Sequence, residues 1–445
     1  MKKSIQILLM AIALLPAIVQ AQDTLPPALP ASWTLENSIA YALQHNISVS
    51  TQRLSTRSAQ EDLLQSRAAK LPNLTGAASA SLVNSNNADP VVGGFTTQAS
   101  FSNNYSLSSS IVLYNGGYLK KDIEGKELAV AAASLNVAQT ANDITLSITQ
   151  SYLNILLAKE NIVYLDDLLT TSKEQLKQAT QRYEAGSLSK KDYLQFQSQV
   201  ASDEYNLVNA RNAYAQNVLT LKQLLLLPTE YRFEVSVPSD LAQLPSTRSL
   251  TDALDAAQQT RPEVQLSELA IKQAEVNLAL AKTATRPTVS LGANLSSGYS
   301  DNQTNPYLKQ LNNNFYQSIG LNVSIPIYNR RVNKTAINKS NIAIEQARLA
   351  MLDTRNTLNQ QVEQAWTNWQ NAQAQYVSAT TQLKTSEESY AITNEQLKYG
   401  SVNMVEVMQQ KTLYVQATQS FIQARYSSIL YSKIYDFYAG IPVTL

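Results

Sequence analysis

The sequence predicts an α+β membrane protein in which one structural unit has been duplicated and fused. The first observation is a set of landmarks that returns 215 residues later, or 214 residues later from a Tyr-Asn pair onward. The paired landmarks are Leu35 and Leu250, Pro72 and Pro287, Tyr114 and Tyr328, Gly186 and Gly400, and Pro228 and Pro442. The second is a seven-residue apolar period in two long segments, and the third is a two-residue alternation just before them. A period of this length excludes a solenoid repeat.

The first 21 residues have the pattern of a secretory signal, which is removed after export. Lys2 and Lys3 precede an apolar stretch over 5–19, and small residues surround the predicted cleavage site after Ala21. A membrane anchor helix is the alternative, but the segment is short and no charged flank follows it. We expect a mature chain that starts at Gln22 with an extended, proline-rich lead.

The composition excludes several kinds of site. The chain has no cysteine, which excludes disulfides, thiolate metal ligands and a lipidated N-terminal cysteine. The formal net charge is +1, so nothing favours a nucleic-acid partner. His45 is the one histidine, in a predicted short helix, and no metal, nucleotide or nucleophile motif occurs. The sequence therefore predicts no catalytic residue, no metal and no cofactor.

The duplication divides the mature chain into two repeats of the same order. Each repeat is predicted to contain a helix, a strand hairpin and a long helical hairpin. In the first repeat, 22–228, the strand hairpin spans 73–114 and the helical hairpin 118–226. In the second, 249–445, the corresponding ranges are 287–328 and 332–438. Residues 229–248 form the predicted linker.

Each helical hairpin contains one long helix with a seven-residue period, which gives a coiled-coil seam. Residues 118–184 lack proline, and residues 332–399 lack proline and glycine. The large seam residues are Ile148, Ile155, Ile162, Leu169, Leu176 and Tyr183, then Val362, Trp369, Tyr376, Leu383, Tyr390 and Leu397. Mostly small residues follow three positions later, which allows close helix approach. We expect two shorter helices to stack end to end beside each long helix.

The strand hairpins alternate in polarity with a period of two, as membrane strands do. In 315–328 the odd positions are mostly apolar and the even positions mostly Ser, Gly and Asn, and 101–114 alternates similarly. Their partner strands are weaker, and loops are predicted over 84–98 and 300–314. A soluble hairpin is the alternative in each case. Because four strands cannot close a barrel and open edges are not tolerated in lipid, a membrane barrel needs further chains.

These features, in this order, resemble the TolC family of outer-membrane efflux proteins over about Trp33 to Pro442. The local motifs are TLENSIAYALQHN at 34–46, KLPNL at 70–74, LYNGG at 113–117, QRYEAGSLSKKDYL at 181–194 and QLKYGSVNMVEVM at 396–408. The resemblance implies a homotrimer with a TolC-like 12-stranded β-barrel, four strands per chain, continued by a long periplasmic α-helical coiled-coil barrel. It implies the outer membrane and its lipid as surroundings. It also implies a periplasmic adaptor (membrane fusion) protein and an inner-membrane transporter as partners. Residues 231–238 and the proline-rich lead are candidates for the family's equatorial region.

The resemblance also implies where the functional residues lie. The hairpin tips Gly186, Ser187, Gly400 and Ser401 would receive the adaptor. In this family, acidic residues at the sixth and ninth positions after the second tip glycine line the closed pore. Glu406 fits the sixth position, whereas Gln409 departs at the ninth, which leaves a single acidic ring; Asp192 is the first-repeat counterpart of Glu406. In this family a Tyr and an Arg near the second tip can form bonds that restrain the closed state. Leu397 and Val402 stand at those positions here, so the resemblance does not imply these bonds for this chain.

Together these expectations predict an outer-membrane exit duct that passively conducts small molecules such as drugs. Energy must come from a partner, because no nucleotide site is present, and enzyme activity is not expected. One alternative is the exit duct of a type I protein-secretion system. An alternative of another class is a non-channel periplasmic coiled-coil scaffold. A periplasmic adaptor would need a lipoyl-like β-domain, for which no candidate strands remain.

Overall fold

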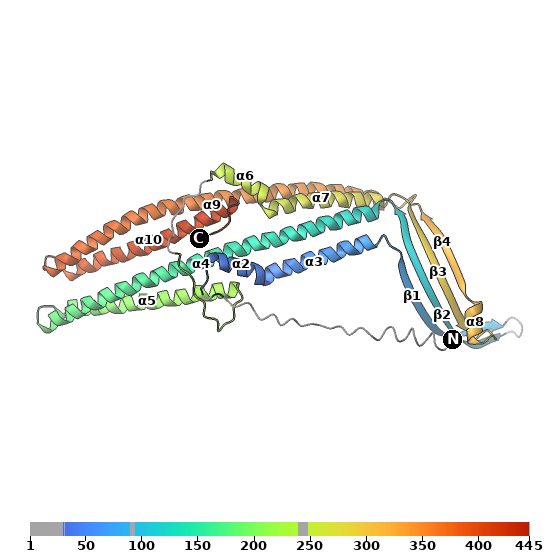
Figure 1. Ribbon diagram of the computed structural model, residues 1–445, viewed down its shortest axis with the longest axis horizontal. Coiled ribbons are helices and arrows are strands. Elements are labelled where there is room, and N and C mark those ends of the chain that lie inside the picture. The colour runs from blue at the N-terminus through green and yellow to red at the C-terminus, as the bar shows by residue number, and fades with distance from the viewer. Residues whose placement is uncertain (1–29, 31, 90–93, 239–247, 445) are drawn as a thin grey trace.

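The computed structural model describes residues 30, 32–89, 94–238 and 248–444 (Figure 1). The chain is a long rod of helices with a four-stranded antiparallel sheet at one end and two helical tips at the other. The predicted signal at 1–21 and most of the proline-rich lead lie outside the described residues. Within the described ranges, no helix combines the length and apolar character that a membrane crossing requires.

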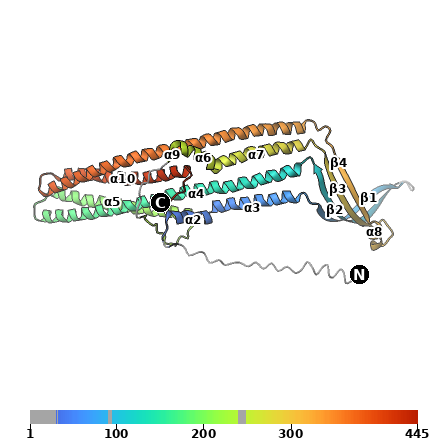
Figure 2. The same cartoon turned by 45° about the horizontal axis from the view of Figure 1, so that its top comes forward.

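Two helices of 67 residues, α4 (Tyr118–Glu184) and α9 (Val332–Lys398), run the length of the rod. At about 1.5 Å per residue each measures about 100 Å. Both α3 (Ile47–Ala68) and α5 (Lys190–Leu224) pack along α4, one beyond the other (Figure 1). In the same way α7 (Pro262–Thr283) and α10 (Met404–Tyr438) pack along α9. The predicted end-to-end stacking is therefore confirmed. Figure 2 shows α3, α4, α7 and α9 as four neighbouring rods.

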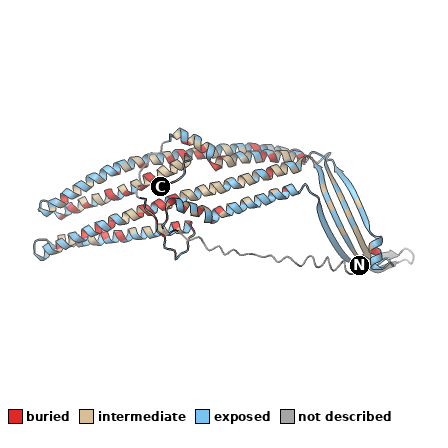
Figure 3. Ribbon diagram, viewed as in Figure 1, coloured by how far each residue is buried: buried red, intermediate tan, exposed pale blue. Residues whose placement is uncertain are grey.

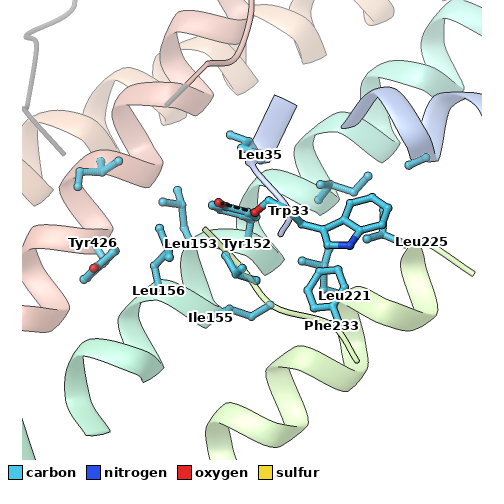
Figure 4. Packing of buried hydrophobic residues seen from close by; sticks show 14 of the residues in the cluster. Trp33, Leu35, Tyr152, Leu153, Ile155, Leu156, Leu221, Leu225, Phe233 and Tyr426 are labelled. Carbon is cyan, nitrogen blue, oxygen red and sulfur yellow. Dashed lines mark hydrogen bonds between the residues drawn. The ribbon is translucent and has the colours of Figure 1, made fainter. Parts of the chain in front are cut away.

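The short helices α2 (Leu35–His45) and α6 (Leu250–Thr260) begin the two repeats. Near α2, the linker residue Phe233 packs with Trp33 and Leu221 in a buried apolar cluster (Figure 4). Trp33 forms a parallel bridge with Val235, and the Tyr152 hydroxyl donates to the carbonyls of Ser236 (2.6 Å) and Trp33 (3.1 Å). The side chains of Trp33, Tyr152 and Val235 join one buried apolar cluster with Leu221. The described part of the linker thus packs against α4 and Trp33 at the level where α3 and α5 meet.

The sheet contains β1 (Asn73–Asp89), β2 (Gly94–Asn115), β3 (Thr288–Ser300) and β4 (Tyr316–Ser324), in that order. The loop expected over 84–98 is wrong for 84–89 and 94–98, because the ladder between β1 and β2 continues to the pair Asp89 and Gly94, and residues 90–93 lie outside the described residues. Backbone pairing with a partner strand overrides the weak strand preference of Asn and Ser there. The last strand ends at Ser324, before the predicted 328, since Pro326 has no amide to donate. The loop over 300–314 contains a short helix, α8 (Tyr307–Asn313).

One face of this sheet is apolar and the other is polar. The register aligns Leu107 with Leu295, and Leu291 with Leu321. Residues that share the apolar face are Leu74, Leu82, Leu107, Ile111, Val289, Leu291, Leu295, Ile319, Leu321 and Val323. Ser and Asn residues dominate the opposite face. In an isolated chain both faces are largely exposed (Figure 3), so the apolar one requires a nonaqueous neighbour.

A bulge near the helical end of β2 shifts its alternation by one residue. Val112 pairs with Ser290, and Tyr114 then pairs with Val289, so Leu113 is left over. The sequence alternation places Leu113 on the apolar face, but in the structure Tyr114 occupies that position, opposite Val289. Bulges of this kind increase twist and redirect a side chain.

Candidate functional site at the helical tips

Both helical hairpins turn at a glycine with left-handed backbone. Gly186 has φ +73° and Gly400 has φ +72°. The serine that follows each glycine donates its amide to the carbonyl five residues earlier, at 2.8 Å for Ser187 and 3.0 Å for Ser401. This is a Schellman motif, which satisfies the last carbonyls of a helix. Apart from the glycine itself and its neighbours along the chain, no described atom lies within 4 Å of where a Cβ would stand on either glycine, so both turns are open surface.

The two acids predicted for the constriction occupy equivalent places, each in the first turn of a return helix. Ser189 caps α5: its hydroxyl accepts the amide of Asp192 (3.1 Å) and donates to the Asp192 carboxylate (2.7 Å). Asn403 caps α10 by accepting the amide of Glu406 at 3.0 Å. Within the described part of the chain, the Glu406 carboxylate makes no hydrogen bond or ion pair. The Asp192 carboxylate is therefore hydrogen-bonded within its own helical turn, whereas the Glu406 carboxylate is exposed.

Gln409 lies one helical turn after Glu406 on the same exposed face of α10. The opposite face of this turn carries Met404 and Val407, which are buried against Phe196 and Ala179 of the other hairpin. A single chain thus brings Glu406 and Gln409 together. It places Asp192 on the other tip, with no described hydrogen bond or ion pair to Glu406.

Leu397 and Val402 pack into the same apolar cluster at the tips. They occupy the two positions at which the resemblance implies a restraining Tyr and Arg. In this chain the two tips are therefore held together by apolar contact at those positions. The stacked rings of Tyr183 and Tyr193, 5.0 Å apart, brace the first tip from within.

A buried ionic cluster lies behind the tips and joins the two hairpins. Lys411 on α10 is 1% exposed, and its Nζ donates to the Asp203 carboxylate of α5 at 2.9 Å. The same Nζ lies 2.5 Å from the hydroxyl of Ser172 on α4, which also donates to Asp203. Gln199 donates to the second carboxylate oxygen of Asp203 at 2.8 Å. Burial lowers the pKa of Lys411, while the hydrogen bond and charge of Asp203 act in the opposite direction.

Sequence reasoning missed this cluster, although a signal was present. Met404, Lys411 and Thr418 are all buried at a seven-residue spacing, so a lysine stands at a seam position of α10. A charged residue in a buried seam needs a partner of opposite charge. The partner, Asp203, comes from a helix of the other repeat, which local patterns do not reveal.

The described residues show no cluster of His, Asp and Glu that could hold a metal ion. A groove of about 540 Å³ lies between α4 and α7, toward the sheet and away from the tips. Leu128, Leu269 and Gln273 are among the residues that line it. Its lining carries no convergent set of reactive groups, so the tips remain the candidate site.

Known proteins share this arrangement. A family model described as outer membrane efflux protein matches residues 39–225 and 253–429, one segment in each repeat. The outer membrane efflux protein BepC of Brucella suis is 20% identical over 405 residues, covering 90% of this chain and 84% of that protein. The pyoverdine export outer membrane protein OpmQ of Pseudomonas aeruginosa is 24% identical over 292 residues, covering 62% of this chain and 57% of that protein.

Among solved structures, the CmeC outer membrane channel of Campylobacter jejuni has the same fold. Its TM-score is 0.75 at 18% identity, with 92% of this chain and 86% of that chain covered. The fold is thus TolC-like, with the sheet as the chain's share of a barrel and the helices as its share of a tunnel. The chain belongs to the outer membrane efflux protein family, as an exit duct of the Gram-negative outer membrane whose helical rod lies in the periplasm.

Proposed function

We propose that three copies of this chain close a twelve-stranded barrel and a continuous tunnel. The observation that carries this proposal is the pair of open sheet edges. Among the described strands, β1 pairs only with β2 and β4 pairs only with β3. An unpaired edge is not tolerated in lipid, so β4 of one copy would pair with β1 of the next. Half-buried seam residues such as Trp369 and Tyr376 would gain further cover from neighbouring helices.

The assembled duct would receive cargo from an inner-membrane transporter through a periplasmic adaptor. The open, exposed turns at Gly186–Ser187 and Gly400–Ser401 are where the adaptor would dock. The duct itself would perform no chemical step, and its cargo would move passively. Small molecules are the favoured cargo, in keeping with the pyoverdine export named for the relative OpmQ.

Glu406 would supply the charge of the periplasmic mouth. Three exposed carboxylates, one per copy, would form a ring that attracts cations at the narrowest point. Gln409 would add a neutral polar ring one turn deeper. Asp192, which is hydrogen-bonded to Ser189, would stabilise the first tip and would contribute less than Glu406 to the negative potential of the ring.

Two measurements test the assignment. The mature protein should be extracted from outer membrane only with detergent, with a mass of three chains; a detergent-free monomer would support the periplasmic scaffold. A strain lacking the protein should accumulate small toxic compounds. Loss of one extracellular protein with unchanged accumulation of such compounds would instead support the protein-secretion duct.

A further inference from the structure

The helix α8, in the loop between β3 and β4, folds back onto the apolar face of the sheet. The register places Tyr105 opposite Ser297, and both side chains point to that face. The Ser297 hydroxyl donates to the carbonyl of Leu311 at 2.5 Å. The hydroxyls of Tyr105 and Tyr307 are hydrogen-bonded at 3.0 Å. Helix α8 therefore lies against the outside of the barrel wall and does not cover its mouth.

This loop is ordered by its own hydrogen bonds. The side chain of Gln310 is fully buried; its oxygen accepts the Ser300 amide at 2.9 Å. Its nitrogen donates to the carbonyls of Gln303 (3.2 Å) and Asn305 (2.7 Å). One glutamine thus closes the loop from inside, so α8 keeps its place without a partner.

The outward surface of α8 is amphipathic. Leu308 is 78% exposed, and the neighbouring Lys309 is exposed and makes no ion pair with any described residue. On the apolar face, the ring of Tyr299 lies 4.9 Å from the ring of Tyr307 of α8 and 6.4 Å from the ring of Phe101, which is exposed. Aromatic girdles of this kind mark the boundary between hydrocarbon and headgroups.

The height of α8 agrees with that boundary. From Val289 to Tyr299 the apolar face rises ten residues, or about 33 Å along the strand. With a strand tilt of about 40°, this is about 25 Å along the membrane normal, the usual height of an apolar barrel band. The helix lies at the far end of this band, where its Leu311 carbonyl meets Ser297, on the side away from the periplasmic rod (Figure 1).

We propose that α8 anchors the barrel in the outer leaflet, with Leu308 among the acyl chains and Lys309 paired with lipid headgroup phosphates. We assign outer-membrane lipid as the occupant of this surface. Along it, the apolar face of the sheet is followed by aromatic rings and then by Lys309, which has no ion-pair partner among the described residues. Lipid phosphates supply the complementary charge. The inference rests on the proposed barrel, since only a closed barrel turns this face toward lipid.

The absence of cysteine in the chain allows a direct test. Single variants Leu308→Cys, Ile319→Cys, Asn322→Cys and Thr304→Cys would carry a small fluorophore in the full-length protein in vesicles. We expect quenching by bromine-labelled acyl chains at 308 and at 319, the reference on the apolar face. The probes at 322, on the polar face, and at 304, in the loop, should respond to aqueous iodide instead.

The outcomes separate this inference from the proposed barrel. If position 308 responds to iodide like 304 while 319 responds to labelled lipid, the anchor is refuted and the barrel stands. If 319 also fails to respond to lipid, the barrel itself is refuted. Adding Lys309→Glu should reduce lipid quenching at 308 by about half in vesicles with lipopolysaccharide, whose phosphates are net anionic. It should leave quenching unchanged in phosphatidylcholine alone, whose phosphate is balanced by its own choline cation. An equal response in both vesicles would overturn the pairing of Lys309 with net-anionic phosphates.

Discussion

Removal of the Lys411 charge should loosen the contact between the two helical hairpins far more than removal of a surface lysine. At the 2.9 Å separation of Lys411 and Asp203, Coulomb's law with an effective dielectric constant of about 20 gives an attraction of about 6 kcal/mol. Desolvation of the two ions offsets this gain. Truncation of one partner leaves the other charge buried and alone, which costs about 3–5 kcal/mol. We therefore expect Lys411→Met to destabilise the region behind the tips by that amount.

Hydrogen exchange of the detergent-solubilised protein, followed by mass spectrometry, measures this effect locally. Peptides around Ser172, Asp203 and Lys411 should exchange about a hundred to a few thousand times faster in the variant. Lys384→Met, at an exposed position of α9, is the matched control and should change little. The double variant Lys411→Met/Asp203→Asn removes both charges and should recover most of the lost protection. Less than a threefold change in Lys411→Met, or no recovery in the double variant, would refute a buried ion-pair role.

The same lysine predicts a pH effect of defined sign. Burial lowers the pKa of Lys411 from its ordinary 10.5. Between the lowered value and 10.5 the unfolded chain binds more protons than the folded chain, so unfolding free energy rises with pH there. Burial raises the pKa of several tyrosines, such as Tyr152 and Tyr426, and these oppose the trend over the same range. The test is therefore the difference: in denaturant titrations from pH 8 to about 10.5, the unfolding free energy of the parent should rise relative to that of Lys411→Met. Equal slopes would contradict the shift.

Three further changes test the mouth, the tip and the linker. Glu406→Gln should lower cation selectivity in planar bilayers about twofold or more, whereas the control Glu204→Gln, on exposed α5 surface, should not. If Glu406→Gln and the parent have equal cation selectivity, Glu406 is not the selectivity filter. Gly400→Leu adds about 1–2 kcal/mol of backbone strain and should weaken adaptor pull-down, whereas Gly400→Asn should be tolerated; intact binding in both would contradict docking there. Tyr152→Phe removes the hydroxyl that bonds to the linker and should lower the local stability of the linker by about 1–3 kcal/mol. Hydrogen exchange at 231–236 should then become faster, and unchanged exchange would refute the role of this hydroxyl.

The sequence predicted the rod well because its pattern is long and local. Twelve seam positions follow a seven-residue period with no proline to interrupt them, and this pattern predicts two long helices. The strand faces were also predictable, since alternation follows directly from strand geometry. The helix ends followed from Gly186 and Gly400, whose left-handed backbone needs no distant partner.

The features that sequence reasoning missed depend on contacts between distant segments. The ladder over 84–89 and 94–98 exists because β1 and β2 pair with each other, although their Asn and Ser residues have weak strand preference. Helix α8 holds its position through Gln310, whose partners are backbone groups of a loop with no local signature. Asp203 and Lys411 are 208 residues apart in the chain, and nothing in either helix identifies the other.

The mouth differs between the two repeats because the residue that caps each return helix differs. Ser189 has a hydroxyl that both accepts the Asp192 amide and donates to the Asp192 carboxylate, so the first acid is held in its own turn. Asn403 accepts the Glu406 amide through its side-chain oxygen, and the carboxylate of Glu406 stays exposed. Equivalent backbones therefore present one restrained acid and one exposed acid. In a threefold assembly the periplasmic field would then have three principal charges, and exchanging the caps, Asn403→Ser with Ser189→Asn, should weaken the contribution of Glu406 and strengthen that of Asp192.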